Sequence, residues 1–341
     1  MVFAVNGEYL FSGGPKGVQV WRVKDWIRTA MVTTTDEVSR LVVSKDGRWI
    51  GAGTDNGHMY VWDADTHTQT FKHKVDDRAV TGLDFSPSNS SRLVSASGNR
   101  TASIWDIGSR KEVRTLCHDN WVYAAQYSPQ GDRIATATVD SVRVYDSSDG
   151  TLLVHIAVTF TPCSDSGLLW SQNHLLVISD RTIKQFEASS GSLVSQWSVP
   201  DTDELSCIAL PKHREYIIYS TNCTVSFLDT ATHAQLGPIQ HSGDVYSIAV
   251  SPHSLIAIGG EEGKITAYRL SNVSSVSCSI LPSVVVYHVF TSFKHAGFSG
   301  TRHSDWYCCP RSLEACTTSD RELIIDHSRP QVLGLEEACT R

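Results

Sequence analysis

The sequence contains no hydrophobic run that could cross a bilayer as a helix. Its apolar stretch at residues 284–290 falls far short of the roughly 20 residues that a membrane helix needs. The N-terminal residues also lack a basic region followed by an apolar run, so no secretory signal is predicted. We therefore expect no membrane span and a location in the cytoplasm or the nucleus.

Positive charge is in short supply. Lys and Arg number 29 against 36 Asp and Glu, which gives a formal net charge of −7. Such a balance provides no excess of positive charge to attract phosphate backbones or anionic lipid, so neither nucleic acid nor a membrane is expected as a partner. The nine cysteines are odd in number and scattered, which favours reduced thiols over a disulfide framework.

The common enzyme signatures are missing too, namely His-Glu-X-X-His, Gly-X-Ser-X-Gly and Cys-X-X-Cys. Residues 259–266 superficially resemble a phosphate-binding loop, but they have three residues between the glycines and Ile265 after the lysine, so they indicate a turn between strands. The remaining candidate metal ligands lie near the C-terminus: His303, Cys308, Cys309, Cys316 and His327. Adjacent cysteines rarely bind one tetrahedral ion. We expect no catalytic residue, no metal and no cofactor.

What the chain does contain is a globular composition and an internal repeat. Hydrophobic residues make up 41% of it, with nine tryptophans. A large apolar residue, usually aromatic, returns after each β-rich hexamer at steps of 40 to 43 residues. These seven marker residues are Trp21, Trp62, Trp105, Tyr145, Phe186, Leu228 and Tyr268. Seven marks at one period predict seven copies of one structural unit.

A second pattern recurs within the period. An alternating strand ends at Ser-Pro in residues 80–87, 122–129 and 245–252, where proline cannot donate to the β-ladder. A short strand of small and β-branched residues follows, and then a tight turn. Trp62 and Trp105 fall in the third strand of their units, so we expect both to be buried between neighbouring sheets.

The repeat resembles that of the WD40 family over residues 1–281, and the stretch 236–245 is similar to the blade junctions of fungal WD40 proteins. The resemblance implies an all-β, seven-bladed β-propeller with four-stranded antiparallel blades. In this family a His, a Ser or Thr, a turn Asp and the Trp form a hydrogen-bonded set in each blade. No repeat here carries all four, and the residues that fill part of the set are His118, His241, Asp140 and Asp180.

The first repeat begins almost at its second strand, so the first blade is expected to be incomplete, with only residues 1–5 for its innermost strand. We expect residues 276–280 to form the outer strand of the last blade. Residues 284–290 have high β propensity, and we predict that they return to the first blade and latch the ring. The rest of 282–341 is expected to be a poorly ordered C-terminal extension. The alternative is that the chain is a fragment of a longer propeller protein.

Propellers bind through the loops on their faces, because their strands are packed into the core. The resemblance implies that the partner face bears the loops into the first strands. Residues flanking those strand starts include Glu37, Thr81, Glu204 and Ser206, and the favoured candidates are Arg40, Arg78, Trp121, Tyr123, Asp244 and Tyr246. The sequence thus predicts a non-catalytic scaffold or adaptor that binds other proteins or peptides, as a monomer or a subunit of a complex. The alternatives are a quinoprotein-like propeller enzyme and a ligand-sensing propeller cut from a larger receptor.

Overall fold

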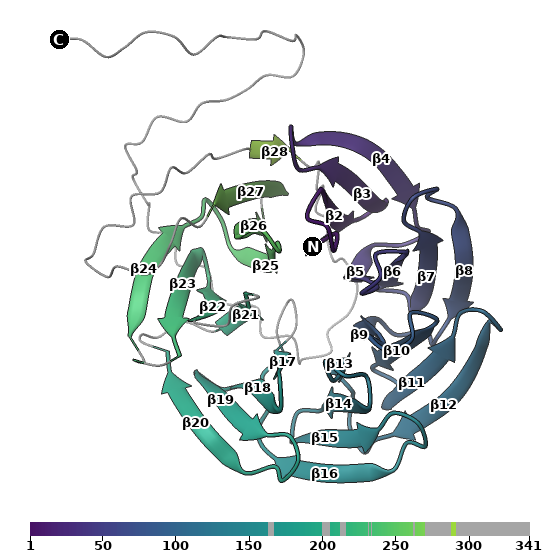
Figure 1. Ribbon diagram of the computed structural model, residues 1–341, viewed down its shortest axis with the longest axis vertical. Coiled ribbons are helices and arrows are strands. Elements are labelled where there is room, and N and C mark those ends of the chain that lie inside the picture. Colours follow the sequence, from purple (N-terminus) through teal and green to yellow (C-terminus); the bar gives the residue numbers. More distant parts are fainter. Residues whose placement is uncertain are drawn as a thin grey trace, which may run out of the picture. The chain divides into compact units, whose positions relative to one another are not determined.

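Seven four-stranded antiparallel sheets form a ring in the computed structural model, and successive sheets follow one another around it (Figure 1). The structure describes residues 1–162, 167–199, 205–211, 216–230, 232, 234–261, 263–269 and 288–290. Each sheet is one blade, and its strands follow the chain order from the centre of the ring outward. The predicted seven-bladed propeller is confirmed.

The first four blades contain sixteen strands. Blade 1 consists of β1 (Val2–Phe3), β2 (Tyr9–Gly14), β3 (Gly17–Arg22) and β4 (Ile27–Thr33). Blade 2 consists of β5 (Val38–Val43), β6 (Trp49–Thr54), β7 (His58–Asp63) and β8 (Gln69–Lys74). Blade 3 consists of β9 (Val80–Phe85), β10 (Arg92–Ser97), β11 (Thr101–Asp106) and β12 (Lys111–Cys117). Blade 4 consists of β13 (Ala124–Tyr127), β14 (Arg133–Ala137), β15 (Ser141–Asp146) and β16 (Leu152–Ala157).

The other three blades repeat the arrangement. Blade 5 consists of β17 (Leu168–Ser171), β18 (His174–Ser179), β19 (Thr182–Glu187) and β20 (Leu193–Ser198). Blade 6 consists of β21 (Leu205–Ala209), β22 (Tyr216–Thr221), β23 (Thr224–Asp229) and β24 (Gln235–Gln240). Blade 7 consists of β25 (Val245–Val250), β26 (Leu255–Gly260), β27 (Lys264–Arg269) and β28 (His288–Phe290).

All seven marker residues lie on the third strand of their blades, as the repeat predicted. Each pairs across the ladder with a fully buried aliphatic residue of the second strand, as Trp105 does with Leu93 and Tyr145 with Ile134. Trp62 and Trp105 are each only 2% exposed, which confirms their predicted burial. The Ser-Pro pairs follow the innermost strands β9, β13 and β25, and residues 259–266 span the turn from β26 to β27.

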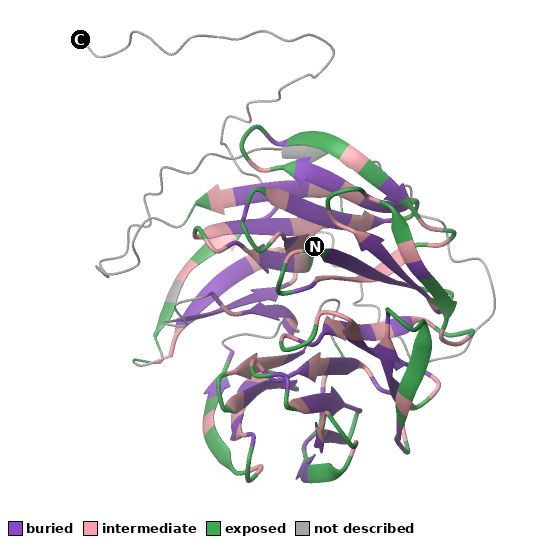
Figure 2. Cartoon of the chain, turned by 45° about the vertical axis from the view of Figure 1, so that its right-hand side comes forward, coloured by how far each residue is buried: buried purple, intermediate pink, exposed green. Residues whose placement is uncertain are grey.

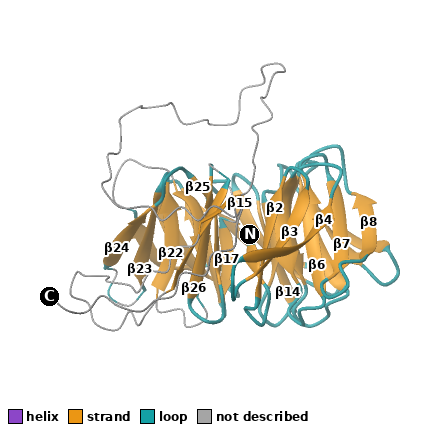
Figure 3. Cartoon of the chain, turned by 90° about the horizontal axis from the view of Figure 1, so that it is seen from above, coloured by secondary structure: helices purple, strands orange, loops and turns teal. Residues whose placement is uncertain are grey.

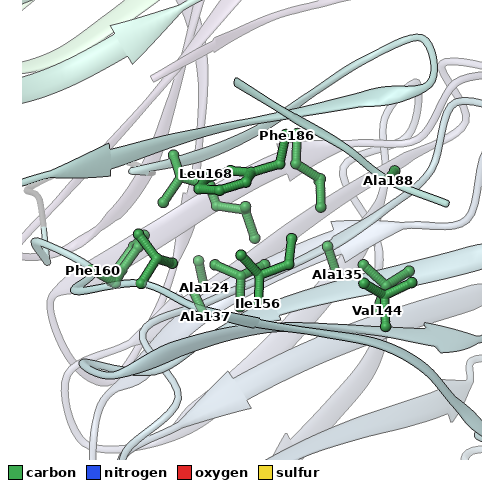
Figure 4. Packing of buried hydrophobic residues seen from close by; sticks show 14 residues of the cluster. Ala124, Ala135, Ala137, Val144, Ile156, Phe160, Leu168, Phe186 and Ala188 are labelled. Atoms are coloured by element: carbon green, nitrogen blue, oxygen red, sulfur yellow. The ribbon is translucent and has the colours of Figure 1, made fainter. Parts of the chain in front are cut away.

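The hydrophobic core is divided into seven clusters, and each fills the space between two neighbouring blades. Figure 4 shows the cluster between blades 4 and 5, where Ala124 and Ile156 of blade 4 face Leu168 and Phe186 of blade 5. Burial falls toward the rim, where the outer strands expose much of their length (Figure 2). Packing between blades therefore supplies most of the hydrophobic stabilisation.

The ring closes differently from the prediction. Blade 1 has all four strands, because β1 occupies the innermost position even though it spans only Val2–Phe3. The described part of the expected latch, β28, pairs with β27 as the outer strand of blade 7, with Ile265 opposite Val289. The latch to blade 1 was therefore wrong: β1 already fills the open inner edge, while β27 needs an outer partner. The propeller also extends past the predicted boundary at 281; residues 276–280 and 284–287 lie outside the described residues.

Side-chain packing joins blades 1 and 7 instead. Phe3, Leu10 and Trp21 of blade 1 form one cluster with Ala249, Ala257 and Ile265 of blade 7. The imidazole of His253 also lies 3.1 Å from the carbonyl oxygen of Asn6. Within the described ranges, no helix is long and apolar enough to span a membrane.

Candidate interaction face

Each blade has four antiparallel strands in chain order, so each later innermost strand starts at the end of the ring where the preceding outer strand ends. The loops that enter these innermost strands therefore open on one side of the ring. Figure 3 shows loops gathered on two opposite sides of the sheets. We call the side that bears the loops into β5, β9, β13, β17, β21 and β25 the entry face. Every described candidate for partner binding lies on or near a strand start at this face.

Three of the predicted residues come together on the entry face. The guanidinium carbon of Arg78, which precedes β9, lies 4.8 Å from the ring centroid of Trp121 in the loop before β13. Trp121 is 36% exposed, and its ring centroid lies 6.4 Å from that of Tyr123. The Tyr123 ring stacks in turn on Phe160, which is buried beneath it. We call Arg78, Trp121, Tyr123 and Phe160 the aromatic array.

Backbone hydrogen bonds hold the array in place. The Val122 N–H donates to Ser97 of blade 3, and the Tyr123 N–H donates to Ala137 of blade 4. Val122 itself is fully buried, so the residues on either side of it cannot shift without disturbing the core. Sequence reasoning missed Phe160; its only signal was an aromatic residue three positions after the end of an outer strand.

Polar pairs fix the loops around the array. Asp119 accepts a hydrogen bond from Arg143 at 2.8 Å, and this guanidinium lowers the pKa of the Asp119 carboxyl. Asn120 donates to Asp140 at 2.9 Å. The pKa of Asp140 is lowered chiefly by the hydroxyl that Thr138 donates to it. Asp140 thus shapes the turn between β14 and β15, the position that the family resemblance gave it.

Arg40 has a different environment. Its guanidinium donates to the carbonyl oxygens of Thr81 at 2.6 Å and Ser39 at 2.8 Å, so it links blade 2 to blade 3. The Thr81 hydroxyl then donates to the carbonyl of Val122 in blade 4. These bonds link β5 to β9, and β9 to the residues just before β13. Arg40 is half-buried, and these hydrogen bonds give it a structural role between blades as well as a place on the entry face.

Asp244 and Tyr246 form a separate group. Both are exposed, Tyr246 by 44%, at the start of β25 in blade 7. Blades 5 and 6 separate them from blade 4 on one side of the ring, and blades 1 to 3 do so on the other (Figure 1). Ser206 is half-buried on β21, and Glu204 lies outside the described residues.

The hydrogen-bonded blade sets are partial, as the sequence predicted. The indole N–H of Trp105 donates to Ser95 at 2.8 Å, and that of Trp21 donates to Ser12 at 2.9 Å. In blade 4, Nε2 of His118 lies 2.8 Å from the Thr136 hydroxyl. Burial, and then the nearby Arg143 charge, lower the pKa of His118 to about 4, so it is neutral at pH 7.

His241 and Asp180, the other two residues of the predicted set, have different environments. Nε2 of His241 is buried and has no hydrogen-bond partner among the described residues. In blade 7 the position that corresponds to Thr136 of blade 4 is occupied by Ile258. The side chain of Ile258 can neither donate nor accept a hydrogen bond. Asp180 adopts a left-handed conformation with φ of 54° in the turn between β18 and β19, which supports its predicted turn position.

A carboxyl group that sequence reasoning missed lies between two innermost strands. Asp84 on β9 accepts a hydrogen bond from the backbone N–H of Tyr127 on β13 at 2.8 Å. Burial raises the pKa of Asp84 to about 7, against the opposing effect of the N–H groups of Tyr127 and Phe85. Its signal was the single charged residue of an alternating strand. In the part of the chain that the structure describes, no three His, Cys, Asp or Glu residues are grouped to hold a metal.

Comparisons with known proteins agree with this architecture. The family model described as "WD domain, G-beta repeat" matches residues 28–63, 65–106 and 110–155. Autophagy-related protein 16 of Arabidopsis thaliana is 24% identical over 222 residues, which cover 60% of this chain and 44% of that protein. Human WD repeat and SOCS box-containing protein 1 is 28% identical over 102 residues, 29% of this chain and 24% of that protein. The chain thus matches less than half the length of these relatives.

Solved structures show the same fold. The Cps50 (Swd1) β-propeller domain of Myceliophteria thermophila has a TM-score of 0.71 and 18% identity, covering 79% of this chain and 96% of that one. A chain in the crystal structure of the mitotic checkpoint complex has a TM-score of 0.69 and 17% identity, covering 80% of this chain and 89% of that one.

Proposed function

We propose that this chain, a seven-bladed β-propeller whose residues 28–63, 65–106 and 110–155 match the WD-repeat family model, is a non-catalytic adaptor that binds a segment of another protein on the entry face over blades 3 and 4. The observation that carries the proposal is the aromatic array, an exposed indole with a guanidinium 4.8 Å from its centroid and further rings packed behind it. Tryptophan, tyrosine and arginine are the side chains that dominate interface energies.

The array is suited to this role because little of it must be reorganised on binding. Arg78 is already positioned by Trp121, and Tyr123 is already stacked on Phe160. Binding therefore costs less free energy for the ordering of side chains than it would on a mobile surface. We propose that the partner is a protein or peptide, and that neither nucleic acid nor a membrane surface binds here, in keeping with the net charge of −7.

The absence of catalysis is part of the proposal. The array offers aromatic faces and donor groups, but no pair of groups arranged for acid and base work. Burial raises the pKa of Asp84 to about 7 and lowers the pKa of His118 to about 4. Asp84 is hydrogen-bonded to Tyr127 and His118 to Thr136, so both groups serve contacts within and between blades. We further propose that the protein works in the cytoplasm or the nucleus, which the unbridged thiols of Cys117 and Cys223 support.

The test compares surface variants at two places on the same face. Affinity purification with quantitative mass spectrometry would use wild-type protein, a Trp121→Ala/Tyr123→Ala double variant and, as the matched control, Tyr246→Ala in blade 7. We expect partners that bind wild type and Tyr246→Ala but are depleted about tenfold or more with the double variant. Equal recovery of every partner by the double variant, with its melting temperature preserved, would contradict the proposal.

A further inference from the structure

The outer strands of the blades share a bulge that allows their edges to be compared position by position. In blades 1 to 5 the ladder between third and outer strands shifts by one residue beside the marker residue. Two residues of the outer strand therefore face one marker residue. In blade 4, for example, Val144 pairs with Val154 and Tyr145 with Leu152, so Leu153 is the extra residue.

The residues in this bulge divide the blades into two kinds. Blades 1, 2 and 3 carry at least one polar or charged residue in the pair: Arg28 and Thr29, Gln69 and Thr70, Glu112 and Val113. Blades 4 and 5 carry only aliphatic residues: Leu152 and Leu153, Leu193 and Val194. The four aliphatic side chains are 46–53% exposed. Val113 of blade 3 extends this exposed group at 47%.

Charge on the outer strands follows the same division. An outer strand is an open edge, and proteins usually protect such edges with lysine, other charges or proline. β8 carries Lys72 and Lys74, β12 carries three charged residues and β24 carries Pro238. β16 and β20 have no Asp, Glu, Lys, Arg or Pro. Two neighbouring edges thus lack the Asp, Glu, Lys, Arg or Pro that would protect them, and each begins with exposed aliphatic residues.

The two edges lie next to each other in the fold. Gly191, in the turn that leads into β20, lies against Val154 and Ile156 of β16; a Cβ on this glycine would come within 2.8 Å of Val154. The start of β20 therefore packs beside β16. We call Leu152, Leu153, Leu193 and Val194 the rim patch; β16 and β20 lie on the outside of the ring (Figure 1).

We propose that the rim patch and the open edges of β16 and β20 form a second binding surface, distinct from the entry face, for an extended and uncharged apolar segment of another protein. Such a segment can add a strand to an open edge while its side chains pack on the leucines. The lack of charge on both edges disfavours a charged segment, whose side chains would lose water without gaining a partner.

The size of the patch favours a segment over a second copy of this chain. Four half-exposed aliphatic side chains offer a few hundred Å² at most. A stable dimer buries about 800 Å² on each partner. The outer edge of a ring is also convex, so a second propeller could touch only part of it, whereas an extended chain can follow a single strand.

The test uses arrays of immobilised octapeptides that span uncharged aliphatic, aromatic, acidic and basic extended sequences. Wild-type protein is compared with a Leu152→Gln/Leu193→Gln double variant, which copies the glutamine that blade 2 carries at the same position. A Trp121→Ala variant is the matched control on the entry face. We expect wild type and Trp121→Ala to select uncharged aliphatic peptides, and the double variant to bind them about tenfold more weakly or worse.

Hydrogen exchange locates the contact. A selected peptide should slow amide exchange in β16 or β20 and leave β8 and β12 unchanged. Selection of charged peptides, or equal binding by the double variant, overturns the proposal. Wild-type dimerisation that the double variant abolishes also overturns it, because the occupant would then be a second copy. Since the control variant alters only the entry face, failure of the adaptor proposal and failure of this one give different results.

Discussion

Single residues decide how strongly each blade is stiffened. Trp105 and Trp21 donate to buried serine hydroxyls, whereas the same positions in blades 5 and 6 are held by Phe186 and Leu228, which have no donor. Those blades are stabilised by packing alone at this position. The hydrogen bonds of the marker residues therefore differ from blade to blade even though the backbone repeats.

The Trp105 hydrogen bond gives a direct test of this view. Ser95→Ala should lower the free energy of unfolding by about 1–3 kcal/mol, because it leaves a buried indole N–H without an acceptor. Equilibrium urea unfolding measures this difference. Ser198→Ala, at an exposed position on β20, is the control and should change the free energy of unfolding by about 0.5 kcal/mol or less. Equal effects of the two variants would show that the bond contributes nothing.

Asp84 makes stability depend on pH. Its folded pKa of about 7 is above the unfolded value of 3.8, so between these values the folded protein keeps a proton that the unfolded chain has lost. The Asp84 contribution to the free energy of unfolding therefore falls as pH rises through this window. We expect Asp84→Asn to gain thermal stability relative to wild type between pH 4 and pH 8, as measured by differential scanning calorimetry.

The control for this prediction is a carboxyl group with the opposite shift. The pKa of Asp140 is lowered, so its ionised form stabilises the fold and that contribution is lost as pH falls through the lowered pKa. Asp140→Asn should therefore lose stability relative to wild type as pH rises. If both variants respond to pH in the same direction, the account of Asp84 is wrong.

At the scale of elements, close approach between innermost strands sets the spacing of the ring. Gly82 on β9 lies against β13, where a Cβ would come within 2.7 Å of the backbone nitrogen of Ala125. Neither strand can move away easily, because Asp84 on β9 accepts from the N–H of Tyr127 on β13 and Thr81 on β9 donates to Val122 just before β13. A single methyl group at this point should push two blades apart.

Gly82→Ala is therefore expected to lower the free energy of unfolding by about 1–3 kcal/mol through overpacking. Gly108→Ala is the matched control, because the nearest atom to its added Cβ, in Asp106, is 3.5 Å away, an ordinary contact. Chemical denaturation of both variants measures the difference. Similar stabilities for the two would mean that the strands separate without cost.

The elements that could be predicted from sequence are those with a local signal. The marker residues located the third strands, and Ser-Pro located the ends of β9, β13 and β25. The pairing of β28 could not be predicted, because its partner β27 is separated from it by a long stretch and a short β-prone segment fits any open edge. The array was only half predictable: Arg78, Trp121 and Tyr123 each followed from strand starts, but their mutual contacts depend on how blades 3 and 4 pack.

At the scale of the whole molecule, the blades share one backbone arrangement but carry different surface residues. Blades 3 and 4 carry the aromatic array on the entry face, while blades 4 and 5 carry the rim patch. The two surfaces use different loops and strands of one rigid framework. The two proposed partners therefore need not displace each other, which is the property that the proposed adaptor role requires.

Ring closure at blade 7 yields the last prediction, which compares two truncations. A chain that ends at Phe293 keeps β28 and should melt within about 1 °C of the full chain, because residues 1–293 form one compact unit. A chain that ends at Leu281 loses β28 and exposes the outer edge of β27, so it should melt at a lower temperature and associate as its concentration rises. Calorimetry and light scattering measure the two effects, and hydrogen exchange should be faster in β27 of the shorter chain alone. Identical melting and identical β27 exchange in the two truncations would show that β28 does not stabilise blade 7.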